Sequence, residues 1–204
     1  MKSSQKTSMK KWMGLVLAGG LLTSGLAQAE FDRGSMLANT CVGCHGIDGI
    51  SSGPAIPSIA GMSEYYFIET MKEYRDDVRP STIMGRLARG YSDQDIKDMA
   101  KYFSNLEYVQ VQQPHDPQMA QVGKRLHSSF CDRCHDAGGT IADDDAGFLS
   151  GQMRPYLQYA LEDYMQGNRN FVESRMEREL NSLINRHGEE GIQQLLEYYA
   201  SGQE

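Results

Sequence analysis

The chain has 204 residues with 27 acidic and 20 basic side chains, which gives a formal net charge of −7 at pH 7. Such a surface disfavours nucleic acid as a partner and suits a protein with a basic docking patch. The length allows one domain or two small ones.

The first 29 residues have the three parts of an export signal. Four lysines precede an apolar stretch, residues 12–26, which ends in the small-x-small sequence Ala27-Gln28-Ala29. We therefore expect a signal peptide over residues 1–29, cleavage after Ala29 and a periplasmic mature chain with a formal charge of −11, since the leader contains no acid. The apolar stretch is short for a membrane span, and no later segment approaches about twenty apolar residues. No stable span is expected after cleavage, and an uncleaved anchor is the alternative interpretation.

Two copies of the sequence Cys-x-x-Cys-His follow, at residues 41–45 and 131–135. In this pattern both thiols add to the vinyl groups of haem c as thioethers, and the adjacent histidine binds the iron. A zinc site would use all four thiols and leave both histidines without a role, and a thioredoxin-like dithiol expects a βαβ pattern that the chain lacks. We therefore expect two covalently attached haem c groups, held by Cys41, Cys44, Cys131 and Cys134, with His45 and His135 on the irons.

Apolar spacing predicts two helices after the first motif. Side chains at i, i+3, i+4 and i+7 form one stripe over residues 67–74, and a second stripe covers residues 96–103. Ser92 and Asp95 fit the N-terminal cap of the second helix, and Asn105 fits its C-terminal end.

A second axial ligand is expected in each half, and methionine is the first candidate. Met84 lies between the two stripes, where a loop can turn its thioether towards the iron. Met71 and Met99 lie on the stripes themselves, so we interpret them as core residues, because methionine packs well into irregular gaps. Met62 is left open.

The second motif opens a repeat of the first half at an offset of ninety residues. The stripe of residues 67–74 returns at 157–164, and Pro155 suits the first turn of that helix. The closing stripe returns at residues 192–199, where the offset has grown to ninety-six. Strand signals are weak throughout, so we predict two small all-α domains, each folded round its haem, over residues 30–109 and 122–204, with a linker over residues 110–121.

The comparison of the halves predicts Met176 as the axial ligand of the second haem, at an offset of 92 from Met84. Met165 is its main competitor because it also lies between the two stripes, and Met153 is left open. The remaining histidines are more typical of surface or helix residues than of iron ligands, and they are His115, His127 and His187.

With these residues in place, the mature chain resembles a tandem dihaem cytochrome c over nearly its whole length. Residues 57–61 are similar to the Pro-x-Leu-x-Gly segment of class I cytochromes c, in which the proline carbonyl accepts a hydrogen bond from the axial histidine. Gly147 takes the place of Pro57 in the second half, so the carbonyl is kept and the rigidity is lost. The resemblance implies an all-α fold of two tandem class I cytochrome c domains whose haems need not have equal potentials.

Two families with this plan are similar to the chain. Residues 44–49 resemble the first haem segment of the cytochromes c4, which are free-standing periplasmic carriers. A closer resemblance is to the cytochrome subunit of flavocytochrome c sulfide dehydrogenase, and it is carried by residues 81–86, 90–92, 151–152, 155–160 and 198–201. That resemblance implies a partner flavoprotein subunit that carries FAD and oxidises sulfide, and a soluble cytochrome c as electron acceptor. The chain itself has no dinucleotide fingerprint.

We therefore expect an electron-transfer protein with His45 and Met84 on one iron and His135 and Met176 on the other. Two filled axial positions leave no open site for a substrate, so catalysis by the chain alone is not expected, and a His/Met pair favours a high potential. The preferred interpretation is the electron-transfer subunit of a sulfide–cytochrome c reductase. The alternatives are a free-standing cytochrome c4-type carrier to a terminal oxidase and a gas sensor, which would need one open site.

Overall fold

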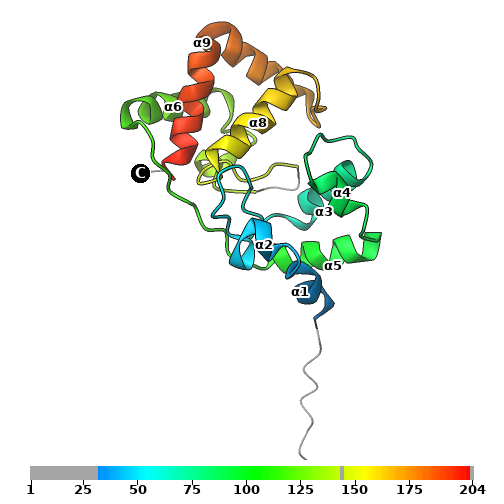
Figure 1. Cartoon of the computed structure of the whole chain (residues 1–204). Helices are drawn as coiled ribbons and strands as arrows, with labels where there is room; N and C mark the ends of the chain where they lie inside the picture. Colours follow the sequence, from blue (N-terminus) through cyan, green and yellow to red (C-terminus); the bar gives the residue numbers. More distant parts are fainter. Residues whose placement is uncertain (1–31, 143–144, 203–204) are drawn as a thin grey trace, which may run out of the picture. The chain divides into compact units, whose positions relative to one another are not determined.

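Helices form both halves of the chain in the computed structural model, which describes residues 32–142 and 145–202 (Figure 1). The first half, residues 32–109, contains α1 (Arg33–Ala38), α2 (Val42–His45), the short 3-10 helix η1 (Ile47–Gly49), α3 (Glu64–Arg75), α4 (Met84–Ala88) and α5 (Asp93–Ser104). The second half, residues 117–202, contains α6 (Pro117–Phe130), α7 (Asp136–Gly139), α8 (Arg154–Met165) and α9 (Ser174–Ala200). The described residues include no β-strand, which confirms the all-α prediction for them.

The predicted signal peptide over residues 1–29 and its cleavage site after Ala29 lie outside the described residues. Asp32 caps α1, because its carboxylate accepts hydrogen bonds from two backbone N–H groups in the first turn of the helix, both at 3.1 Å. Within the two ranges that the structure describes, no helix has both the length and the apolar composition needed to span a bilayer.

The helices predicted from the apolar stripes form as α3, α5 and α8, and capping residues explain where they begin. At the start of α3, the Ser63 hydroxyl accepts a hydrogen bond from a backbone N–H of the first turn at 3.1 Å. Pro155 lies in the first turn of α8, where its missing N–H costs nothing. Ser92 and Asp95 form the predicted capping box of α5, and Asn105 ends that helix.

Two helix boundaries differ from a simple repeat. α6 begins at Pro117, inside the predicted linker of residues 110–121, because the Asp116 carboxylate accepts hydrogen bonds from two first-turn N–H groups at 2.8 and 3.0 Å. α9 runs for 27 residues and bends at Gly188, whose positive φ of 62° suits glycine. Its two parts follow the order of α4 and α5, which accounts for the larger offset near the end of the chain. The domain boundaries themselves stay a prediction.

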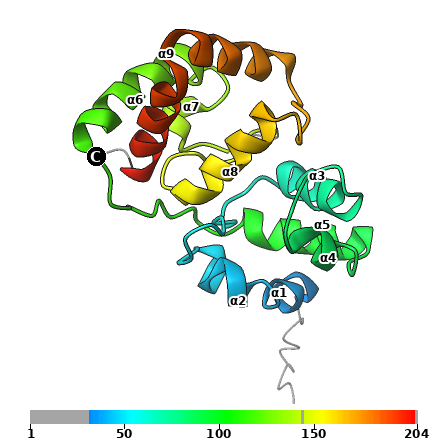
Figure 2. The ribbon, with the colours of Figure 1, turned by 45° about the horizontal axis from the view of Figure 1, so that its top comes forward.

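Each half has its own hydrophobic core. In the first half, α3 packs against α4 and α5, and α1 packs against α5. Met71 and Met99 are buried in this core, as predicted. In the second half, α8 and α6 both pack on α9, and α6 crosses the C-terminal part of α9 (Figures 1 and 2). Both cores belong to one compact unit.

A glycine allows two helices to approach closely at one crossing in each half. A Cβ atom on Gly34 of α1 would lie 2.5 Å from the Asp98 carbonyl oxygen of α5. A Cβ atom on Gly123 of α6 would collide in the same way with the Gln194 carbonyl of α9. Because backbone atoms cannot move aside as a flexible side chain can, neither crossing has room for a larger residue.

Gly123→Ala is expected to lower the free energy of unfolding by about 1–3 kcal/mol, because the added methyl group forces α6 away from α9. Chemical denaturation followed by circular dichroism measures this change. Gly53→Ala is the control, since a Cβ atom there makes only ordinary contacts with Ile56, at 3.6 Å or more. A Gly123→Ala protein as stable as the control would contradict the close crossing.

Candidate haem sites

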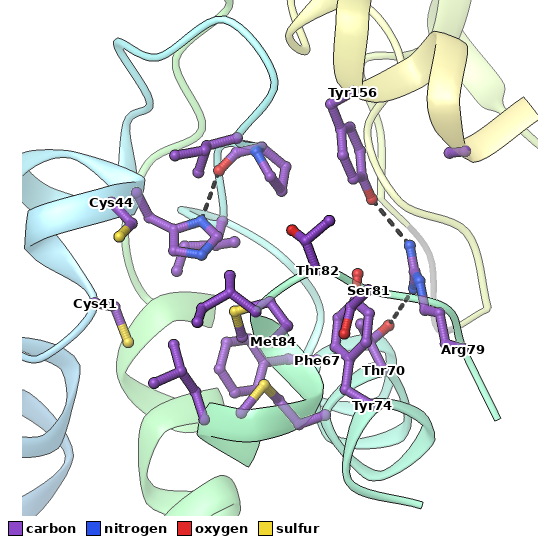
Figure 3. A pocket seen from close by; sticks show the side chains of 18 of the residues that line it. Cys41, Cys44, Phe67, Thr70, Tyr74, Arg79, Ser81, Thr82, Met84 and Tyr156 are labelled. Atoms are coloured by element: carbon purple, nitrogen blue, oxygen red, sulfur yellow. Dashed lines mark hydrogen bonds between the residues drawn. The ribbon is translucent and has the colours of Figure 1, made fainter. Parts of the chain in front are cut away.

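The first cavity contains all the residues that the sequence predicts for the first haem. Its volume is about 670 Å³, in the range of sites that enclose a small ligand. Cys41, Cys44 and His45 line it from α2 and the residue before it, and Met84 lines it from the start of α4. Figure 3 shows the two cysteines and Met84 around the same space.

The second cavity repeats this arrangement in a volume of about 360 Å³. Cys131, Cys134 and His135 line it from the turn between α6 and α7, and Met176 lines it from the first turn of α9. Met165, the competing candidate, is not among the described residues that line this cavity, and it is 45% exposed. The fold therefore brings together the four residues predicted in each half.

Other methionines also contribute to the walls. Met62 and Met71 line the first cavity, and both are buried in the first core. Met153 is buried too, but it is not among the described residues that line the second cavity. Met84 differs from Met62 and Met71 because it is only partly buried and begins a helix after a loop, so its thioether is free to turn.

His45 is held by a backbone carbonyl. Its Nδ1 lies 2.8 Å from the Pro57 carbonyl oxygen, as the resemblance to the Pro-x-Leu-x-Gly segment implied. Burial lowers the pKa of His45, and the bond to the Pro57 carbonyl opposes this shift. A neutral ring whose Nδ1–H donates to a carbonyl leaves Nε2 as the metal-binding atom.

His135 has different surroundings. Its buried Nδ1 has no hydrogen bond of normal geometry with any described residue, although the Gly147 backbone is near enough to raise its pKa. Burial is the largest influence and His127 the next, and they lower the pKa of His135 to about 4. A Cβ atom on Gly147 would lie 3.1 Å from the ring of Tyr66. Glycine therefore replaces proline where an aromatic side chain of the first half needs the room.

The four cysteine thiols are free in the structure. Burial raises the pKa of Cys41, and it raises the pKa of Cys131 to about 11. A thiol held neutral in this way is a poor redox catalyst, because that role needs the thiolate. An uncharged thioether, by contrast, suits an apolar wall.

A cluster of arginine and tyrosine side chains, which the sequence analysis missed, links the two halves. Arg79 is 5% exposed and donates from Nη2 to the hydroxyl of Tyr156, in the other half, at 3.0 Å (Figure 3). Its guanidinium carbon lies 5.0 Å from the centre of the Tyr74 ring, and Arg169 lies 4.4 Å from the Tyr164 ring in the same way. The two arginines are ninety residues apart, and so are Tyr74 and Tyr164. This shared repeat offset is the sequence signal from which the two arginine–tyrosine pairs could have been predicted.

The two arginines indicate what the cavities hold. Both line the first cavity and are buried, with exposed fractions of 5% and 9%. Among the described residues, Arg79 approaches a carboxylate only at 3.9 Å, at Glu73, and Arg169 forms no ion pair. A buried guanidinium is costly unless an anion accompanies it. These walls fit a group that is largely apolar, that carries a metal His45 can bind, and that has anionic substituents to pair with the arginines. Haem with its propionates is such a group.

The two cavities share part of their walls, because Tyr66, Tyr156, Ala160 and Arg169 line both. Burial acts to raise the pKa of Tyr66, but Arg79 and Arg169 outweigh burial and the pKa is lowered. The field at this boundary is therefore positive. Groups bound in the two cavities would adjoin one positively charged, hydrogen-bonding boundary.

The other histidines are not among the described residues that line either cavity. His127 is buried on α6, with Nδ1 3.0 Å from the Tyr199 hydroxyl and Nε2 3.3 Å from an Asp132 carboxylate oxygen. His115 bonds to a backbone carbonyl of the segment between the halves at 3.0 Å. His187 is exposed beside the bend of α9. None of the three histidines therefore lies at the wall of either cavity as the structure describes it.

Comparisons with known proteins show likeness to cytochromes c. The cytochrome c family model matches residues 31–107. Cytochrome c4 of Pseudomonas aeruginosa is 34% identical over 172 residues, which cover 78% of this chain and 83% of that protein. The cytochrome subunit of sulfide dehydrogenase from Chlorobaculum tepidum is 46% identical over 74 residues, which cover 36% of this chain and 66% of that protein. The crystal structure of reduced recombinant cytochrome c4 from Pseudomonas stutzeri superposes with a TM-score of 0.69 and 26% identity, covering 82% of this chain and 96% of that one.

Arg79→Met is expected to destabilise the haem-loaded protein by about 3 kcal/mol, because anionic groups in the cavity lose a buried cationic partner. Arg89→Met is the control, since Arg89 is exposed and pairs with the exposed Asp77 at 2.9 Å, where a loss costs at most about 1 kcal/mol. Chemical denaturation followed by haem absorbance measures both changes. Equal effects of the two substitutions would contradict the role assigned to Arg79.

Proposed function

The chain is a cytochrome c4-like electron-transfer protein that belongs to the cytochrome c4 family, and on this premise we propose that each half holds one covalently attached haem c. The predicted fold class, two tandem class I cytochrome c domains, is confirmed by the family match and by the structural likeness, which extends over 82% of the chain. When bound, each haem supplies an iron that changes oxidation state by one electron. The observation that carries the proposal is the meeting of Cys-x-x-Cys-His with a methionine at one cavity in each half.

In the first half, Cys41 and Cys44 form the thioether bonds, and His45 and Met84 are the axial ligands. The shared cavity supports this assignment, and so does the bond from His45 to the Pro57 carbonyl, which orients the ring for metal binding. Arg79, which also lines this cavity, would hold the propionates and compensate their charge.

In the second half, Cys131 and Cys134 form the thioether bonds, and His135 and Met176 are the axial ligands. Met176 is preferred to Met165 because it lines the cavity while Met165 is 45% exposed. The buried Nδ1 of His135 lacks the firm carbonyl bond that His45 has, so the second ligand is less basic. We therefore expect the two redox centres to differ in potential.

The shared wall supports transfer of electrons between the two centres. Tyr66, Tyr156 and Arg169 line both cavities, so haems held there would share part of their protein surroundings. With His45 and Met84 on one iron and His135 and Met176 on the other, no position would be left for a substrate, and the chain would carry electrons for another protein.

We place the mature chain in the periplasm, after cleavage of the signal peptide at Ala29, where it accepts electrons from an FAD-containing sulfide dehydrogenase subunit and passes them to a soluble cytochrome c. The supporting observation is the 46% identity, over 74 residues, with the cytochrome subunit of sulfide dehydrogenase. The formal charge of −11 on residues 30–204 favours partners with basic docking patches.

A free-standing carrier that serves a terminal oxidase is the second candidate. It is favoured by the greater extent of the likeness to cytochrome c4, which covers 78% of the chain rather than the 36% covered by the sulfide dehydrogenase subunit. Both candidates use the same haem sites and differ only in the electron donor and acceptor.

Met84→Ala and Met176→Ala are each expected to abolish the methionine-to-iron charge-transfer band of one haem, because the thioether ligand is lost. Visible spectra of the oxidised proteins measure this. Met165→Ala is the matched control and should leave both bands intact, since this side chain is 45% exposed and is not a residue of the cavity wall. An unchanged band in either ligand variant would remove that methionine from the ligand set.

Purification of the native protein from its source separates the two candidate functions. As a sulfide dehydrogenase subunit, the protein should co-purify with a flavoprotein and be reduced by sulfide only in its presence. As a free-standing carrier, it should purify alone, and sulfide with the flavoprotein fraction should leave it oxidised. Spectrophotometry of the haem bands during sulfide addition measures the rate of haem reduction. A protein that purifies alone and stays oxidised would contradict its role as a sulfide dehydrogenase subunit.

A further inference from the structure

A glutamine of the second half holds the backbone segment that orients the first axial histidine. Gln152 Oε1 accepts a hydrogen bond from the Ser58 N–H at 2.7 Å, and Gln152 Nε2 donates to the Ser58 carbonyl at 2.9 Å. The amide thus pairs with both polar backbone groups of one residue, 94 positions away in the chain.

This contact reaches His45 through a single peptide group. The carbonyl of Pro57, which accepts from His45 Nδ1 at 2.8 Å, and the N–H of Ser58, which donates to Gln152, belong to the same amide. Hydrogen bonds at the two ends of an amide polarise each other, so donation by the N–H makes the carbonyl a stronger acceptor. Gln152 therefore acts on His45 without touching it.

The side chain of Gln152 is fixed in this position. It is 2% exposed and Ser58 is 0% exposed, so water does not compete for these bonds. Oε1 also accepts from the Met153 N–H at 3.1 Å, and the Gln152 carbonyl accepts from Gln113 Nε2 at 2.9 Å. Only one orientation of the amide satisfies the Ser58 and Met153 bonds together.

The corresponding glutamine contact is not repeated at the second haem site. At the offset of ninety, Gln152 corresponds to Met62 and Ser58 corresponds to Phe148. A methionine side chain has no amide to donate or accept these bonds. His135 Nδ1, the counterpart of the His45 atom, is buried without a hydrogen bond of normal geometry. The contact therefore distinguishes one axial histidine from the other.

We propose that Gln152 is a positioning residue for the first axial ligand, which strengthens the His45–Pro57 hydrogen bond from the other half of the molecule and so lowers the potential of the first haem. The proposal rests on the proposed function, because it requires a haem on His45. A stronger bond at Nδ1 places more electron density on the imidazole, and a more basic ligand favours the oxidised iron. Loss of the Gln152 amide should then favour reduction.

Gln152→Met tests this, because it introduces the residue type of the equivalent first-half position at similar length and volume. Redox titration followed by haem-methyl NMR resolves the two haems in the intact protein. We expect the equilibrium constant for reduction of the first haem to rise about threefold to tenfold, which is about 30 to 60 mV for one electron. The second haem should stay within about a factor of two of its original value.

Gln152→Glu is the second variant, since its side chain keeps an acceptor for the Ser58 N–H in either protonation state. The first haem should then not become easier to reduce. Gln158→Met is the matched control on α8, where the same change removes only a bond to Glu162 at 2.9 Å and should move neither potential.

Haem content is measured first, from the absorbance of the denatured proteins. A native protein without haem would overturn the proposed function and this inference with it. Two haems with an unmoved first potential in Gln152→Met would overturn the inference alone. If Gln152 had a purely structural role, both Gln152 variants would unfold at a lower temperature while the potential of the first haem stayed the same. Equal shifts in the potentials of both haems would also indicate a structural role. Either result would contradict the inference.

Discussion

Each half of this protein is built round a cavity that the proposed haem would fill. The cores are modest because each half contributes only about eighty residues, and the walls of both cavities consist largely of side chains that would otherwise pack on one another. An empty cavity of this size would forfeit the dispersion contacts of its whole lining. Two buried cations, Arg79 and Arg169, face the same space without an ordinary ion pair among the described residues. Filling by a large, apolar, anion-bearing metal group satisfies both the packing and the charge.

The same residues that complete the cavities also join the two halves. Arg79 of the first half bonds to Tyr156 of the second, and Tyr66 lies against Gly147, beside the second axial histidine. Gln152 returns a contact in the other direction, to the peptide that holds His45. The two halves are therefore not structurally independent, because each contributes residues that line or position the site of the other half. Substitutions at this boundary should therefore change the haem potentials as well as the stability of the protein.

Sequence alone predicts the parts of this arrangement that are local or periodic. The two Cys-x-x-Cys-His motifs, the stripes that became α3, α5 and α8, and the choice of Met84 and Met176 follow from spacing within each half. Arg79 and Arg169 were missed because charged residues in loops usually face water, and only the fold shows that these two are buried. Their exact repeat offset was a usable signal. Gln152 left no comparable signal, since it acts through the backbone of Ser58, 94 residues away. The domain boundaries and the ligand set stay predictions.

Mass spectrometry of the purified, denatured protein tests most directly whether both cavities are filled by covalent haem. The expected mass is that of residues 30–204 plus two haem groups, retained after unfolding because thioether bonds do not depend on the fold. A mass without haem, or haem that separates from the chain on denaturation, would contradict the covalent filling of both halves. A mass with one haem would contradict covalent attachment in one of the two halves.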